Sequence, residues 1–183
     1  MKKSELGLRL GGAGIALFLN ARCALPPTTE SLETTSTSAA EQTLLAHPSK
    51  SNLYTLALPP SWNSAQAFTT EEAFIEQFTS SLGFLQISIG VGLEVTNQER
   101  IIYLKALAKA KRRPDPLFEE KIIDGQEALV VTYHDENGYL IKEALFRKDD
   151  FNWRIGLKYS PDPQTKAVSE TFFNQMLADF RFQ

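Results

Sequence analysis

The chain has 183 residues, of which 43% are hydrophobic, and its formal net charge is −3. This length and composition predict one globular domain with additional segments, and the mildly acidic balance argues against nucleic-acid binding through bulk charge. The single cysteine excludes an internal disulfide. The sequence has no run of about 20 apolar residues, so no transmembrane helix is predicted.

Residues 1–24 have the pattern of an export signal. Two lysines and an arginine precede an apolar stretch at residues 10–19, as is typical of secretory signals. Cys23 follows directly, where a bacterial lipoprotein would be acylated, although Arg22 is larger than the small residue expected before it. Three interpretations stay open: lipidation at Cys23, ordinary signal cleavage near Ala24, and an N-terminus without a targeting role.

Residues 25–52 are predicted to form a disordered linker, because they are rich in serine, threonine, alanine and glutamate and show no sustained apolar period. Such a linker would tether a lipid anchor to a folded domain, and an extension without a role fits the composition equally well. His47 falls in this segment and is expected to be a solvated loop residue. The folded domain is therefore predicted to span residues 53–183.

The first half of this domain is predicted to begin with a strand at Leu53–Leu58, which Pro59 and Pro60 end. Residues 71–81 fit either a helix or a strand, and the pattern of these residues does not choose between them. Phe84–Val91 carries apolar residues at every second position and is predicted to be a strand.

A helix is predicted from Gln98 to about Arg112, with Asn97 as its N-cap. Four basic residues gather at its C-terminal end: Lys109, Lys111, Arg112 and Arg113. The helix dipole favours cations there, and we weigh this explanation against a patch for an anionic lipid or a partner. A further strand is predicted at Phe118–Ile123.

Consecutive antiparallel strands are predicted from Ala128 onward. An Asn-Gly pair follows the first strand, and a two-residue turn there would place Val131 opposite Ala144. An Asp-Asp pair ends the second strand, and a reversal there would place Phe146 opposite Trp153.

The two registers together predict one apolar face, made of Leu129, Val131, Ala144, Phe146, Trp153, Ile155 and Leu157. A slip of one residue would move a whole strand's side chains to the other face, so the agreement between the two turns favours this register. The opposite face is semi-polar, and we expect it to hold the partner surface: Thr132, Glu143, Arg154 and Lys158.

An amphipathic helix at about Thr165–Asp179 is predicted to cover the apolar face, and Phe180 and Phe182 predict a short closing strand. The order of the elements indicates an α+β fold with an antiparallel sheet.

The sequence contains no catalytic constellation. His134 lies beside two acidic residues, so a metal site or a general base is weighed against an ordinary hairpin residue near the surface. The ordinary residue is favoured, because a metal site needs three or more converging ligands. We therefore expect no enzymatic activity, no metal and no cofactor.

The chain resembles the PsbP-like superfamily, which includes photosystem PsbP proteins and exported lipoproteins of the DcrB and LpqN types. The resemblance rests on residues 54–62, 124–133 and 172–182, and it covers residues 53–183. It favours a strand over a helix in residues 71–81. It implies an antiparallel sheet sandwiched between helices (an α-β-α sandwich), an envelope location and a binding or assembly role.

Our functional hypothesis is an exported, non-catalytic binding or assembly domain of the bacterial cell envelope, in the periplasm or anchored to a membrane through Cys23. Its expected partner is a protein or a small ligand, with membrane contact only through the anchor. The alternatives are a cytosolic adaptor or chaperone of the same fold, and a photosystem-associated extrinsic protein of the PsbP type.

Overall fold

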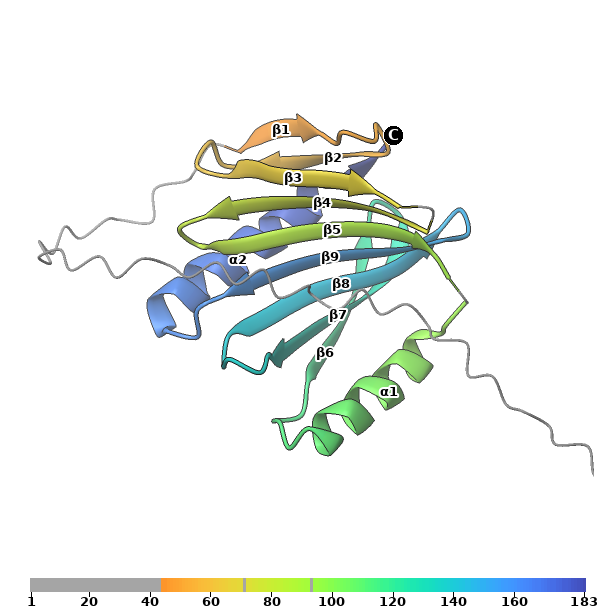
Figure 1. The fold of residues 1–183 in the computed structure, drawn as a ribbon, viewed down its shortest axis with the longest axis vertical. Helices are drawn as coiled ribbons and strands as arrows, with labels where there is room; N and C mark the ends of the chain where they lie inside the picture. The colour runs from red at the N-terminus through yellow and green to blue at the C-terminus, as the bar shows by residue number, and fades with distance from the viewer. Residues whose placement is uncertain (1–43, 71, 93) are drawn as a thin grey trace, which may run out of the picture. The chain divides into compact units, whose positions relative to one another are not determined.

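Two antiparallel sheets and two helices make up the part of the chain that the computed structural model describes, residues 44–70, 72–92 and 94–183 (Figure 1). The larger sheet has seven strands, in the order β3 (Asn63–Thr69), β4 (Ala73–Ser80), β5 (Gly83–Val91), β9 (Phe151–Tyr159), β8 (Leu140–Lys148), β7 (Gln126–His134) and β6 (Leu117–Ile123). The smaller sheet has three strands, in the order β1 (Leu45–Pro48), β2 (Tyr54–Leu58) and β10 (Arg181–Phe182). This architecture confirms the predicted α+β class.

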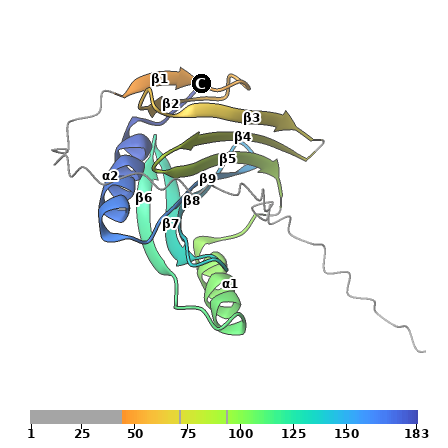
Figure 2. The ribbon, with the colours of Figure 1, turned by 60° about the vertical axis from the view of Figure 1, so that its left-hand side comes forward.

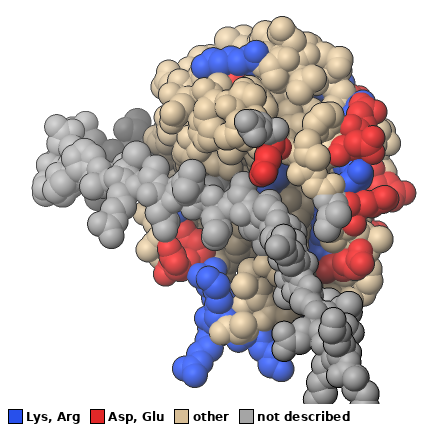
Figure 3. Space-filling view, turned by 45° about the vertical axis from the view of Figure 1, so that its right-hand side comes forward, with Lys and Arg blue, Asp and Glu red and all other residues tan. Residues whose placement is uncertain are grey.

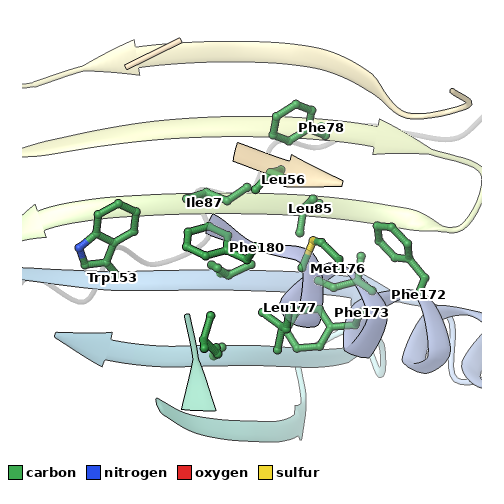
Figure 4. Close-up of a cluster of buried hydrophobic side chains, with 14 of the residues drawn as sticks. Leu56, Phe78, Leu85, Ile87, Trp153, Phe172, Phe173, Met176, Leu177 and Phe180 are labelled. Carbon is green, nitrogen blue, oxygen red and sulfur yellow. The ribbon is translucent and has the colours of Figure 1, made fainter. Parts of the chain in front are cut away.

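Helix α2 (Pro163–Asp179) lies behind the larger sheet in Figure 1 and supplies one wall of the core. It buries Phe172, Phe173, Met176 and Leu177 against the sheet (Figure 4), and each such side chain stabilises the fold by about 1.5–3 kcal/mol. Trp62 closes the edge of the core by stacking on Phe172, with the ring centroids 4.9 Å apart. The predicted helix at Thr165–Asp179 is confirmed.

The smaller sheet covers the rest of the same core face, beside α2. Its central strand buries Tyr54, Leu56 and Leu58, and the Tyr54 ring stacks on Phe180 with a centroid distance of 5.6 Å. Phe182, in β10, packs against the same cluster. The short closing strand is therefore part of the core's cover, as the alternation of the last residues predicted.

Helix α1 (Asn97–Ala110) lies on the other side of the larger sheet, near β6, and it packs loosely. Its one buried residue is Ala108, and the Lys105 ammonium lies 5.7 Å above the Phe118 ring of β6. Figures 1 and 2 show α1 and α2 well separated, on opposite sides of the larger sheet. In the described residues, neither helix has the length and apolar character that a membrane crossing requires.

The N-cap of α1 is Thr96, not the predicted Asn97. The Thr96 hydroxyl accepts a hydrogen bond from the Glu99 amide at 3.2 Å, and the Glu99 carboxylate accepts one from the Thr96 amide at 2.8 Å. This reciprocal pair is a capping box, and its acidic member at the third helical position decides which residue serves as the cap. Asn97 has no such partner three residues later, because Arg100 cannot accept a hydrogen bond.

Residues 73–80 form a strand, as the family resemblance favoured, and not a helix. The strand pairs along its whole length with β5, from Ala73 opposite Gly90 to Ser80 opposite Gly83. Every second side chain faces the core, so Phe78 is fully buried there, and so is Glu76.

The predicted register between β8 and β9 is confirmed. Phe146 lies opposite Trp153 and Ala144 opposite Ile155, and the stacked rings of the first pair have centroids 5.8 Å apart. Asp149 and Asp150 both have positive φ, at 50° and 65°, as a two-residue type I′ turn requires.

The predicted register between β7 and β8 is wrong by one residue. Val130, not Val131, lies opposite Ala144. The Asp135 amide donates to the Tyr139 carbonyl at 2.9 Å, so the loop inside this pair has three residues rather than two. The Asp135 carboxylate explains the longer loop, because it accepts hydrogen bonds from the backbone amides of Asn137 at 2.8 Å and Tyr139 at 2.9 Å. Only Gly138 in the loop has positive φ, which fits a type I turn followed by one left-handed residue.

This slip reverses the two faces of β7. Ala128 and Val130 join the core under α2, whereas Leu129 and Val131 are buried on the opposite face. The apolar face predicted on β8 and β9 is otherwise correct, because their own register is unchanged.

The folded domain begins before residue 53. Residues 45–48, which were predicted to belong to a linker, form β1 and pair with β2 from Leu45 opposite Leu58 onward. His47 is therefore not a loop residue: it lies edge-on to the Phe78 ring, with a centroid distance of 5.0 Å. The predicted signal at 1–24, with Cys23, and the rest of the predicted linker up to residue 43 lie outside the described residues.

Candidate binding surface on the larger sheet

The face of the larger sheet turned away from α2 carries a set of polar side chains that we call the polar sheet face. It is defined by Gln77, Gln86, Ser88, Tyr133, Glu143, Arg154 and Lys158. Strand alternation places them together, because each lies one position away from a residue that faces the core.

Gly156 lies at the centre of this face. It pairs with Gln86 on one side and with Glu143 on the other, while Arg154 and Lys158 flank it along β9. Glycine has no side chain and Gly156 is itself buried, so these charged and amide side chains lie close together around its backbone.

Glu143 and Arg154 form an ion pair beside this position, with 5% and 16% of their side chains exposed. Arg154 also donates to the Tyr133 hydroxyl at 3.4 Å. Burial opposes the charge on Arg154, but Glu143 and Tyr133 together outweigh it and raise the pKa of the guanidinium. Burial, and then Glu143, raise the pKa of Tyr133, so its hydroxyl keeps its proton.

A second ion pair lies at the end of the face near the β7–β8 loop. The Lys158 ammonium is 2.7 Å from the Asp135 carboxylate and 4.8 Å above the Tyr139 ring. Asp135 thus both shapes the loop and holds Lys158 in position.

Two amides extend the face across the neighbouring strands. Gln77 donates to Gln86 at 3.0 Å, and Gln86 is almost completely buried. Sequence reasoning did not select these two residues, although the polar positions of Phe84–Val91 alternate with apolar ones and could have placed Gln86 on this side of the sheet.

Three of the four predicted surface residues are brought together. Glu143, Arg154 and Lys158 share the polar sheet face. Thr132 does not, because the register of β7 places it opposite Lys142, on the side of the sheet that α2 covers. Tyr133 takes the place that was predicted for Thr132.

A separate polar cluster lies inside the core and was not predicted. The Tyr54 hydroxyl donates to the fully buried Glu76 carboxylate at 2.6 Å, and His47 Nε2 lies 3.7 Å from the other carboxylate oxygen. Burial raises the pKa of Tyr54, and Glu76 raises it further. This cluster joins the smaller sheet to β4 and has a structural role.

His134 does not stand in a metal site within the described residues, where no group of three or more histidine, cysteine, aspartate or glutamate side chains could hold an ion. Its side chain is half-buried at the end of β7, and its carbonyl accepts a hydrogen bond from Arg113 at 3.5 Å. Cys23, the candidate for lipidation, is outside the described residues.

No protein-family model and no curated protein matches this sequence. Among solved structures, the chain is similar to the cyanobacterial PsbP protein (CyanoP) from Synechocystis sp. PCC 6803, with 12% identity, a TM-score of 0.53, and coverage of 82% of this chain and 99% of that chain. A protein from Bacteroides thetaiotaomicron is also similar, with 14% identity, a TM-score of 0.46, and coverage of 78% and 49%. The PA94 protein from Pseudomonas aeruginosa has 11% identity, a TM-score of 0.41, and coverage of 74% and 94%. The similarity to the cyanobacterial protein shows that this chain has a PsbP-like fold.

Proposed function

We propose that the chain is a non-catalytic binding or assembly domain of the bacterial cell envelope, and that its polar sheet face receives a segment of a partner protein. The observation that carries this proposal is the ring of Gln86, Glu143, Arg154 and Lys158 around Gly156. Donors and acceptors gathered on one sheet face suit the recognition of a polar chain segment, whose own amides and charges need partners.

Export is the second part of the proposal. The basic and apolar residues before Cys23 support it, because they follow the order of a secretory signal. The resemblance of residues 53–183 to a superfamily that includes exported lipoproteins of the DcrB and LpqN types also supports it. An anchor at Cys23 would hold the domain close to a membrane, and its partner would then be an envelope protein.

The mature N-terminus tests the export proposal. Mass spectrometry of the native protein should find the first 22 residues removed, with a lipid on Cys23 and labelled palmitate incorporated at that residue. A Cys23→Ser variant is the matched control and should lose the label. A full-length, unlabelled protein in the cytoplasm would overturn the export proposal.

Site-specific photo-crosslinking tests the binding surface. We would place the photoreactive residue at Thr79, which is exposed on β4 on the side of the polar sheet face, and at the exposed Gln175 of α2 as a control on the other side. The same crosslinked protein should be recovered from Thr79 in repeated preparations and not from Gln175. Equal yields from both positions would contradict the proposed surface.

Two other functions remain as candidates. A cytosolic adaptor would retain its first residues, so the same mass measurement separates it from an exported protein. A photosystem-associated role draws on the likeness to the cyanobacterial PsbP protein, which extends to the fold alone at 12% identity. Co-purification with photosynthetic membranes in a photosynthetic host would favour that role.

A further inference from the structure

The outward face of α1 combines exposed apolar side chains with basic ones. Ile102 is 60% exposed, and Lys105 and Lys109 are exposed on the same side of the helix, three and seven residues later. Tyr103, which is 48% exposed, lies at the other edge of the exposed side. Lys111 and Arg112 continue the basic character just beyond the last turn. These six residues define the α1 patch.

The positive charge of this patch is not balanced by neighbouring carboxylates. In the described residues, the ion pairs involve none of Lys105, Lys109, Lys111 and Arg112. Figure 3 shows Lys and Arg side chains gathered at the lower end of the domain, where Figure 1 places α1. Because the whole chain carries a net charge of −3, this local excess is a departure from the rest of the molecule.

The needs of the helix do not account for the whole patch. The dipole at a helix C-terminus corresponds to about half a negative charge, which one cation balances. The acidic residue on the exposed side, Glu99, is in the first turn, and its carboxylate is occupied by the capping box with Thr96. The dipole also gives no reason for Ile102 and Tyr103 to face solvent.

The two kinds of side chain together select one class of partner. A polyanion such as nucleic acid would use the basic residues and leave Ile102 in water. An anionic lipid surface uses both, because lysine and arginine contact the phosphates while apolar and aromatic side chains enter the boundary between headgroups and acyl chains.

We propose that the α1 patch docks on a membrane containing anionic lipids, with α1 lying in the plane of the headgroups. This contact is independent of any lipid on Cys23 and goes beyond the proposed function, which needs the polar sheet face alone. A domain held at two points would have a defined orientation on the membrane instead of moving freely on a tether.

Vesicle sedimentation tests the proposal with the full chain carrying Cys23→Ser, so that no acyl group contributes. The protein should sediment with vesicles of phosphatidylglycerol and phosphatidylcholine, and more weakly at high salt, because salt screens charge attraction. Lys105→Glu with Lys109→Glu should weaken this binding about tenfold or more, since both charges are reversed near the surface. The control variant, Lys50→Glu with Lys166→Glu, has the same net charge and changes exposed lysines outside α1.

A second variant tests the apolar half of the patch. Ile102→Ser with Tyr103→Ser keeps every charge and should also weaken binding to the anionic vesicles, while circular dichroism checks that the fold is retained. Equal binding by the wild type and the lysine variant would overturn the proposal. So would an unchanged affinity of the Ser variant together with equally tight binding to heparin, because the patch would then be a general polyanion site. Neither outcome affects the crosslinking test of the polar sheet face.

Discussion

At the scale of single residues, both faces of the larger sheet bury ionisable side chains that have a polar partner. The core face contains Glu76, held by the Tyr54 hydroxyl at 2.6 Å. The polar sheet face contains the ion pair of Glu143 and Arg154, which is almost as well buried. A buried charge is tolerated only when a partner compensates for it, so each of these groups constrains its neighbours.

The pair of Glu143 and Arg154 gives the first prediction. Glu143→Gln should lower the free energy of unfolding by about 3 kcal/mol, because it leaves the Arg154 charge without its partner. The double variant with Arg154→Met should lose much less than the sum of the two single variants. Urea denaturation of the four proteins measures the coupling, and additive losses would show that the pair is not coupled.

At the scale of elements, the ends of helices and the tight loops carry recognisable local chemistry. The Asp162 carboxylate caps α2 by accepting a hydrogen bond from the Thr165 backbone amide at 3.0 Å. Gly83, at the start of β5, and Gly138, in the β7–β8 loop, both have positive φ. Each of these features affects the free energy of unfolding, and the structure shows which substitution there should be the more destabilising.

The cap of α2 should make stability depend on pH in acid. Hydrogen bonds from the Thr165 backbone and side chain lower the pKa of Asp162 to about 2. Because the native value is below the unfolded one of about 3.9, the charged cap stabilises the fold above that pH, and the contribution is lost as the pH falls through about 2. Asp162→Asn keeps a capping oxygen without the charge, so it should be less stable than the wild type near neutral pH, and the difference should shrink as the pH falls toward and below 2. A pH-independent difference in melting temperature would contradict this assignment.

The two hairpin glycines should differ in how well they tolerate alanine. Gly138→Ala should lower the free energy of unfolding by about 1–2 kcal/mol, because a φ of 82° is unfavourable for alanine. The added Cβ causes no clash, since no atom lies within 4 Å of it. Gly83→Ala should cost more, since its Cβ would lie 2.2 Å from the Lys158 carbonyl oxygen. Thermal unfolding of the two variants ranks them, and the reverse order would show that the β4–β5 loop adjusts freely.

At the scale of the whole molecule, the boundary of the folded domain depends on a contact between segments distant in sequence. β1 gives β2 a second hydrogen-bonding neighbour, and His47 reaches across to Phe78 and Glu76 of β4. The smaller sheet therefore needs residues that the composition assigned to a linker.

A shortened chain tests this boundary. A protein that begins at residue 53 should unfold at a lower urea concentration than one that begins at residue 44, because an edge of β2 loses its partner and the side of Phe78 is exposed. The two proteins should keep the same α2 and the same hairpins. Equal midpoints would mean that β1 adds no stability, as expected of a linker segment.

Local patterns were sufficient for most of the secondary structure. The 3.6-residue period of α2, the period of two in β5 and β9, and the Asp-Asp turn between β8 and β9 were all predictable, because each depends on residues close together in the chain. The apolar faces of β8 and β9 followed from the same alternation. The sequence by itself therefore determined the α+β class and the core contribution of these two strands.

Only the tertiary structure decided the rest, because it depends on partners that local alternation does not name. The side chain of Asp135 lengthened the β7–β8 loop by one residue, which moved Thr132 away from the candidate surface and brought Tyr133 to it. The pairing of β1 with β2 placed His47 beside Glu76. The position of α1 against β6 left its basic and apolar side exposed. A period of two or 3.6 residues says which side chains share a face, but the long-range pairing of strands says which face meets the core and which face is turned away from it.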